Sequence, residues 1–201
     1  MRRLPSRSLG SKQEDGIAFG LGRFLGLPAP APEPIIHAMP RARVITCSDA
    51  ASRGAREDRS GPALRDALGR LGFEVDPVVV VPDEEERIAA AILEAVDHDG
   101  VALVVTTGGT GISPRDVTPE AIARIAHKRL DGFGELMRLR SLEKTTMAPL
   151  SRAQAVTRGS ALILSVPGSP AGAVENLQAV EHLVKHALEL LAGAPVERHP
   201  K

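Results

Sequence analysis

The chain is poor in the residues that several common functions require. Its 201 residues include no tryptophan, no tyrosine and only four phenylalanines, so stacking of nucleic-acid bases on aromatic side chains is not expected. Lysine plus arginine and aspartate plus glutamate each total 25, so the chain lacks the excess of basic residues typical of polyanion binders. No apolar run approaches the length of a membrane span. We therefore expect neither nucleic-acid binding nor membrane insertion.

Cysteine is almost absent as well. The single cysteine, Cys47, cannot form a disulfide within the chain, which favours a reducing compartment and thus a cytoplasmic protein. Cys47 ends an apolar stretch that is predicted to be a strand, so we interpret it as a small buried residue rather than a nucleophile.

The first 40 residues differ in composition from the rest of the chain. They hold six of the 16 prolines and show no sustained periodicity. Residues 28–34 alternate proline with other residues, a composition typical of stiff, extended linkers. We predict a disordered or poorly ordered extension over residues 1–40 and one folded domain over residues 41–195.

From residue 43 onward, predicted strands and helices alternate. Apolar runs rich in β-branched residues predict buried strands at residues 44–47, 75–81, 101–105 and 161–166. Apolar residues at helical spacing predict helices that begin near Ser60, Pro82, Thr118 and Pro170. This alternation predicts an α/β fold, with a mainly parallel sheet covered by helices on both faces.

The most distinctive stretch follows the third predicted strand and precedes the helix at Thr118. Glycine lets backbone N–H groups approach an anion, and consecutive N–H groups can form an anion-binding concavity. Threonine hydroxyls can add further donors. We favour phosphate binding over a turn that needs glycine only for its geometry. The residues are Thr106, Thr107, Gly108, Gly109, Thr110 and Gly111.

The common nucleotide-binding motifs do not fit this stretch. A P-loop requires Gly-x-x-x-x-Gly-Lys followed by serine or threonine, and no lysine follows Gly111 in that register. The dinucleotide-binding fingerprint fails because its third glycine is missing. Phosphate charge would therefore be met by backbone N–H groups, a metal ion or Arg115.

Two carboxylates are predicted at the same edge of the sheet. Ligands of such sheets bind at the carboxyl ends of the strands, and Asp83 and Asp116 both follow strand ends. Together with substrate phosphates, two carboxylates are suited to Mg²⁺. Capping of the next helix by Asp83, with Glu86 three residues later, fits its position equally well. Asp116 is also typical of a turn that precedes a helix.

Two other loops are candidates for the same pocket. Pro167, Gly168 and Ser169 lead into the last predicted helix, whose N-terminus and serine hydroxyl can face a phosphate. Ordinary helix capping by Ser169 is the alternative. Ser48 and Asp49 follow the first strand and can shape the pocket, although an aspartate there is also a common turn residue.

Taken together, these segments resemble the molybdopterin adenylyltransferase family, the Mog/MoaB-type domain of molybdenum cofactor biosynthesis. The similarity runs from about residue 43 to residue 193. Besides the residues named above, it rests on residues 58–61, 132–135, 137–138 and 150–152. It implies a three-layer α/β/α sandwich that assembles as a homotrimer. It also implies a nucleotidyltransferase that converts ATP and molybdopterin, with Mg²⁺, into adenylyl-molybdopterin and pyrophosphate. A non-catalytic molybdopterin-binding or scaffold protein of the same fold is the alternative.

The resemblance also implies roles for individual residues. Asp83 and Asp116 match the catalytic and metal-binding carboxylates of the family. One departure is Ala50, where the family often has arginine, so one substrate contact is either missing or supplied by Arg53 or Arg56. A molybdenum insertase is an expected partner. The residues that match substrate-binding positions are Ser48, Asp49, Thr107, Gly108, Gly109, Thr110, Gly111, Pro167, Gly168 and Ser169.

Overall fold

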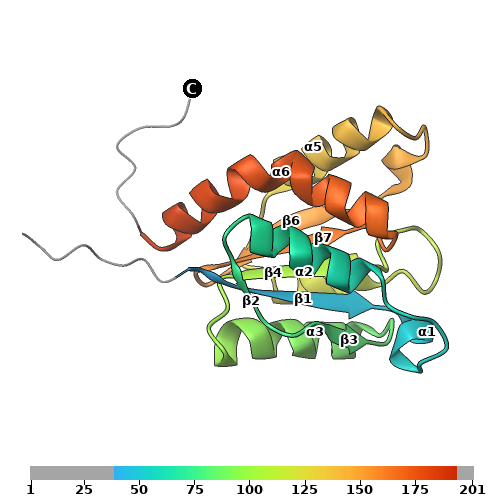
Figure 1. Cartoon of the computed structure of the whole chain (residues 1–201), viewed down its shortest axis with the longest axis horizontal. Coiled ribbons are helices and arrows are strands. Elements are labelled where there is room, and N and C mark those ends of the chain that lie inside the picture. Colours follow the sequence, from blue (N-terminus) through green and yellow to red (C-terminus); the bar gives the residue numbers. More distant parts are fainter. Residues whose placement is uncertain (1–38, 194–201) are drawn as a thin grey trace, which may run out of the picture. The chain divides into compact units, whose positions relative to one another are not determined.

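The computed structural model describes residues 39–193, and the following account is confined to them (Figure 1). The extension predicted over residues 1–40 lies almost entirely outside the described residues, as do residues 194–195 of the predicted domain, so both boundaries stay predictions. Among the helices of residues 39–193, none has the length and hydropathy to cross a membrane.

A seven-stranded mixed sheet forms the centre of the fold. The strands β1, β4 and β7 lie side by side and parallel, with β2 and β3 both pairing parallel to β1. At the other edge β6 pairs antiparallel with β7, and β5 pairs antiparallel with β6. The prediction of a mainly parallel sheet is confirmed. The strands are β1 (Arg41–Cys47), β2 (Glu74–Val75), β3 (Val79–Val81), β4 (Leu103–Thr107), β5 (Lys128–Arg129), β6 (Gln154–Arg158) and β7 (Ala161–Val166).

Helices cover both faces of this sheet. One face carries α2, α5 and α6, and the other carries α3 and α4 (Figure 1). The fold is therefore a three-layer α/β/α sandwich, as predicted. The helical elements are α1 (Asp49–Ser52), α2 (Ser60–Arg70), α3 (Glu85–Leu93), the π-helical η1 (Glu94–His98), α4 (Thr118–Ile125), α5 (Asp131–Leu142), the 3₁₀-helical η2 (Ala148–Leu150) and α6 (Pro170–Leu191).

The central strands are apolar along most of their length because both of their faces are covered. In β4, Leu103 and Val105 pack into the core below α2, α5 and α6, whereas Val104 packs into the core of α3 and α4. In β7, Leu164 packs into the core below α2, α5 and α6, and Ile163 packs into the core of α3 and α4. Successive side chains of a strand point to opposite faces, so a strand between two helical layers needs an unbroken apolar run.

The structure departs from the predicted elements in three places. Residues 75–81 form two short strands, because the segment around Pro77 leaves the sheet and proline has no N–H for a ladder. The antiparallel strands β5 and β6 were not predicted, since β5 has only two residues and β6 carries polar Gln154 and Arg158 at its ends. Strand β4 extends through Thr106 and Thr107, which therefore belong to the sheet and not to the loop.

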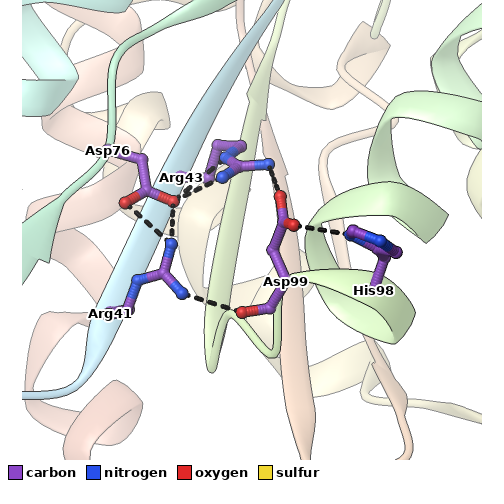
Figure 2. A network of polar contacts seen from close by, with 5 residues as sticks. All are labelled: Arg41, Arg43, Asp76, His98 and Asp99. Carbon is purple, nitrogen blue, oxygen red and sulfur yellow. Dashed lines mark hydrogen bonds and ion pairs between the residues drawn. The ribbon is translucent and has the colours of Figure 1, made fainter.

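Five polar side chains form a network at the amino-terminal end of β1 (Figure 2). The guanidinium of Arg43 donates to Asp76 at 2.6 Å and to Asp99 at 2.7 Å. Arg41 donates to Asp76 at 2.9 Å and to the carbonyl oxygen of Asp99 at 2.8 Å. Nδ1 of His98 lies 2.8 Å from Oδ1 of Asp99. The network links β1 to the segments that precede β3 and β4, at the opposite end of β1 from the loop that follows Cys47.

Candidate active site

The loops that follow β1, β3, β4 and β7 surround a cavity of about 680 Å³. Backbone hydrogen bonds hold neighbouring loops together, from Ser48 N to Val81 O at 2.9 Å and from Gly108 N to Val166 O at 3.2 Å. The predicted convergence of these loops is confirmed. Asp49 and Pro167 do not line the cavity. The predicted site residues that do are Ser48, Asp83, Thr107, Gly108, Gly109, Thr110, Gly111, Asp116, Gly168 and Ser169.

The loop after β4 needs glycine for reasons internal to the protein. Gly108 has a φ of +100°, and a Cβ there would lie 2.2 Å from the carbonyl oxygen of Cys47. Gly109 has a φ of +62°, and its Cβ would lie 2.4 Å from Oγ1 of Thr118. A Cβ on Gly168 would lie 3.1 Å from Cα of Gly108. The geometric alternative therefore accounts for these glycines on its own.

The backbone N–H groups of the same loop nevertheless suit phosphate binding. Within residues 39–193, the backbone N–H groups of Gly109, Thr110 and Gly111 have no hydrogen-bond acceptor. All three residues line the cavity, and Thr110 is buried. Unpaired N–H groups at a buried position are rare, and three in succession suit an anionic ligand.

The three threonines of the predicted stretch have different surroundings. Thr106 is fully buried in β4, where its hydroxyl donates to the carbonyl oxygen of Leu164 at 3.4 Å. The hydroxyl of Thr107 donates to the carbonyl oxygen of Pro167 at 2.8 Å. Only the Thr110 hydroxyl lines the cavity with no partner among the described residues. The hydroxyls of Thr106 and Thr107 thus already donate to backbone carbonyl oxygens, and Thr107, which lines the cavity, stays a predicted substrate-binding residue.

Asp83 is held by the backbone of a different loop. Its Oδ2 accepts a hydrogen bond from Asp49 N at 2.8 Å, and Asp83 N donates in return to Oδ1 of Asp49 at 3.2 Å. The helix α3 has Glu84 at its N-cap, with no side-chain cap hydrogen bond. The capping alternative for Asp83 is therefore wrong. Burial is the main reason why the pKa of Asp83 is raised, and the charges of Asp49 and Asp116 raise it further.

Asp49 connects Asp83 to the loop that carries Asp116. Its Oδ2 accepts from Nε of Arg115 at 3.0 Å and from Nη2 at 2.5 Å, and this guanidinium lowers the pKa of Asp49. Asp116 has the predicted turn geometry, since its Oδ2 accepts from Ser113 N at 2.8 Å. Because Asp116 also lines the cavity, the turn and a role in the cavity are compatible.

Both serines of the predicted site cap helices. Oγ of Ser169 accepts from Gly172 N at 3.2 Å at the start of α6, and Oγ of Ser48 accepts from Ala51 N at 3.3 Å at the start of α1. Arg56 also donates to Oγ of Ser48, at 3.2 Å, and lines the cavity. Arg53 does not line the cavity and lies 3.8 Å from Asp49, with 69% of its side chain exposed. Of the two arginines considered as substitutes for the one that is absent at Ala50, only Arg56 lies at the cavity.

The segment that precedes α2 also lines the cavity, and no role was predicted for its Asp58. Asp58 accepts from Oγ1 of Thr46 at 2.7 Å and from Gly61 N at 3.0 Å, and both Thr46 and Asp58 line the cavity. A Cβ on Gly61 would lie 2.3 Å from Oδ2 of Asp58. An aspartate shortly before a helix that starts with Ser60 is a capping signal, which could have located this residue but not its place at the cavity.

Cys47 also lies against the cavity, but its thiol is inert. It is 3% exposed, and burial raises its pKa to about 12. A thiol with that pKa stays protonated at neutral pH, and the thiolate is the nucleophilic form. The interpretation of Cys47 as a buried residue is confirmed.

Comparison with known proteins identifies the family. Residues 43–189 match the model of the probable molybdopterin binding domain. The chain belongs to this molybdopterin-binding domain family. The molybdopterin adenylyltransferase of Helicobacter pylori strain J99 is 40% identical over 155 residues, which span 75% of this chain and 86% of the relative. The molybdopterin adenylyltransferase of Escherichia coli K12 is 38% identical over 176 residues, spanning 80% of this chain and 90% of the relative.

Solved structures of the family share the fold. The molybdopterin biosynthesis enzyme MoaB of Thermus thermophilus is 45% identical, with a TM-score of 0.73 over 78% of this chain and 99% of that one. The tungsten cofactor synthesizing protein MoaB of Pyrococcus furiosus is 36% identical, with a TM-score of 0.68 over 79% of this chain and all of that one. The resemblance found in the sequence is confirmed, and with it membership of an enzyme family of the nucleotidyltransferase class.

The carboxylates at the cavity suit a metal ion that the substrate helps to bind. No group of three or more histidine, cysteine, aspartate or glutamate side chains within residues 39–193 could hold a metal ion by itself. Asp83 and Asp116 nevertheless lie close enough for the charge of one to raise the pKa of the other. Mg²⁺ is commonly bound by one or two carboxylates together with substrate phosphates and waters. The two aspartates therefore fit Mg²⁺ that arrives with a phosphorylated substrate.

Proposed function

We propose that this protein is a molybdopterin adenylyltransferase, which transfers the adenylyl group of ATP to molybdopterin and releases pyrophosphate. The observation that carries the proposal is the placement of Asp83 and Asp116 on the same cavity as three consecutive unpaired N–H groups of the loop after β4. Carboxylates that suit a divalent cation and N–H groups that suit phosphate are the two halves of a phosphoryl-type transfer site. Relatives 40% and 38% identical bear this name.

The chain supplies binding and orientation in this reaction. The terminal phosphate of molybdopterin would attack the α-phosphorus of ATP, while the bond from this phosphorus to the pyrophosphate oxygen breaks. The N–H groups of residues 109–111, the N-terminus of α6 and Arg56 would bind the phosphate oxygens. Asp83 and Asp116 would hold Mg²⁺, which when bound neutralises phosphate charge. Substrate alignment and charge stabilisation then account for most of the rate enhancement.

Pyrophosphate release by the full-length chain, supplied with molybdopterin, ATP and Mg²⁺, tests this proposal. We expect Asp116→Asn to reduce release by roughly 100-fold or more while molybdopterin binding persists. The matched control is Asp66→Asn, because Asp66 is exposed on α2 away from the cavity, and it should leave both quantities unchanged. Tight molybdopterin binding by the wild-type chain without any ATP consumption would instead establish the non-catalytic binding protein.

We also propose a cellular location, an assembly state and a partner for this protein. We expect a cytoplasmic homotrimer that passes its product to a molybdenum insertase, on the support of family membership alone. Light scattering of the purified chain measures the assembly state directly, and a monomer at micromolar concentration would contradict the trimer.

A further inference from the structure

Arg152 makes four hydrogen bonds to the loop after β4 and to the start of α4, although it does not line the cavity itself. Its backbone N donates to the carbonyl oxygen of Thr110 at 2.8 Å, and its Nε donates to that of Gly111 at 2.7 Å. The two remaining guanidinium nitrogens donate to the carbonyl oxygen of Asp116 and to Oε1 of Glu120. One side chain thus contacts both ends of the segment from Gly111 to Asp116.

That segment has few other attachments. Residues 112–115 are exposed, and Ile112 is 69% exposed. Apart from the bond that Arg152 makes to Asp116, Ser113 and Asp116 bond to each other, and Arg115 donates to Asp49. Nothing else among residues 39–193 hydrogen-bonds the carbonyl oxygens of Gly111 and Asp116. Thr118, just beyond the segment, donates to the carbonyl oxygens of Gly108 and Gly109, so Arg152 is the side chain that holds the segment itself at both of its ends.

We propose that Arg152 is a positioning residue for Asp116 and for the unpaired N–H groups of the neighbouring loop. This inference rests on the proposed function. A guanidinium offers several donors in one rigid plane, so it can hold acceptors at both ends of the segment at once. A lysine keeps the positive charge but offers a single amine on a flexible stem, which cannot reproduce that arrangement. Loss of the planar donor set should therefore shift the Asp116 carboxylate from its position, while Asp83 and Asp116 both remain at the cavity.

Arg158 provides a matched control for a purely structural role. It also contacts α4, but at the far end, where its Nη1 donates to the carbonyl oxygen of Ile125 at 2.9 Å. Its other nitrogens donate to Asp97 at 2.6 and 2.9 Å. Like Arg152 it joins a carboxylate to a backbone carbonyl of this region, yet it touches neither the cavity nor the segment from Gly111 to Asp116.

The experiment compares Arg152→Lys, Arg152→Gln and Arg158→Gln in the full-length chain. We expect Arg152→Lys to remain folded and to lower kcat about 10- to 100-fold, with the KM for molybdopterin changed about 3-fold or less, because misplacement of a catalytic group by about 1 Å has effects of this order. Binding of Mn²⁺ in the presence of a non-hydrolysable ATP analogue, measured by electron paramagnetic resonance, should weaken about 10-fold in both Arg152 variants. Arg158→Gln should lower the melting temperature but keep the wild-type kcat and Mn²⁺ affinity.

The results separate this inference from the proposed function. Wild-type kcat and Mn²⁺ affinity in Arg152→Lys would overturn the positioning role and leave Arg152 as a structural residue. Absence of pyrophosphate release by the wild type would overturn the proposed function. The Mn²⁺ measurement would still decide whether Arg152 positions Asp116, because it requires no turnover.

Discussion

At the scale of single residues, the carboxylates of the cavity already accept hydrogen bonds from protein N–H groups. Asp83 accepts from Asp49 N, Asp116 from Ser113 N and Asp58 from Gly61 N. Each bond orients one carboxylate. The second oxygens of Asp83 and Asp116 accept no hydrogen bond from residues 39–193, whereas that of Asp58 accepts from Thr46. Groups that are oriented in advance need no reorganisation when a substrate arrives, which is a major source of catalytic power.

The carboxyl of Asp83 should destabilise the fold at neutral pH. Because its pKa is raised, chiefly by burial, the folded chain binds a proton at this carboxyl more tightly than the unfolded chain does. As the pH rises from the ordinary pKa of aspartate through the raised value, the unfolded chain loses its proton first and the stability falls. Asp83→Asn is therefore expected to raise the melting temperature slightly at neutral pH, while it reduces pyrophosphate release roughly 100-fold or more.

Thermal unfolding of Asp83→Asn between pH 4 and pH 8 measures this effect. The difference in melting temperature from the wild type should grow with pH and then level off above the raised pKa. Asp66→Asn again serves as the control, since it makes the same chemical change at an exposed position on α2. A lower melting temperature of Asp83→Asn at pH 8 would contradict the expected cost of the buried carboxylate.

At the scale of elements, the loops after β1, β4 and β7 are in direct backbone contact. Gly108 is the point where they meet, since it faces the carbonyl oxygen of Cys47 on one side and Gly168 on the other. This contact sets the distance between the loop after β4 and the N-terminus of α6. The shape of the cavity is thus determined by how closely these elements can approach.

Gly108→Ala should therefore destabilise the protein. Its Cβ would lie 2.2 Å from a backbone oxygen, and its φ of +100° is unfavourable for any residue with a side chain. We expect a loss of about 2–4 kcal/mol in the free energy of unfolding. Gly69→Ala is the matched control, because a Cβ there has nothing within 4 Å and lies in α2. That change should stabilise the protein by about 0.5–1 kcal/mol.

Denaturant unfolding of the two variants measures both values. Their opposite signs separate the demands of this turn from a general effect of replacing glycine by alanine. Equal stability of Gly108→Ala and the wild type would mean that the loop moves away from Cys47 at little cost, and would weaken the argument that glycine is required there by the fold.

At the scale of the whole folded unit, the cavity and a network of ion pairs lie at opposite ends of β1. The cavity lies beyond Cys47, and the network of Arg41, Arg43, Asp76 and Asp99 lies at the start of the strand (Figure 2). The side chains of Arg43 and Asp76 are each 13% exposed, so solvent screens their ion pair only in part. This separation predicts that the two ends respond differently to substitution.

Asp76→Ala should lower stability without changing the activity of the folded enzyme. The change removes the acceptor that two arginines share at 2.9 and 2.6 Å, and we expect a loss of about 2–3 kcal/mol. Glu143→Ala is the control, because its ion pair with Arg140 is 63% and 66% exposed and should contribute about 0.5 kcal/mol or less. The measurements are denaturant unfolding and kcat well below the melting temperature. Equal destabilisation by the two changes would contradict a special role for the network.

The parts of the fold that could be predicted are those that local pattern determines. The strands β4 and β7 were identifiable because both faces of each are covered, which requires an unbroken apolar run. The strand β6 was not predicted because its ends are polar, and the division of residues 75–81 into two strands depends on pairing with β1. Asp83 and Asp116 could be placed at one edge because parallel strands bring their carboxyl ends together.

The sequence by itself determined the α/β class, the family and the candidate residues, since periodicity and motif spacing are properties of neighbouring positions. Only the tertiary structure decided which partner each candidate has. It bonded Asp83 to Asp49, 34 positions away, rather than to its own helix, placed Thr106 inside the sheet, and brought Asp58 and Arg56 to the cavity wall. The physical reason is that burial and hydrogen bonding depend on which distant segments meet, and that arrangement exists only after the strands have paired.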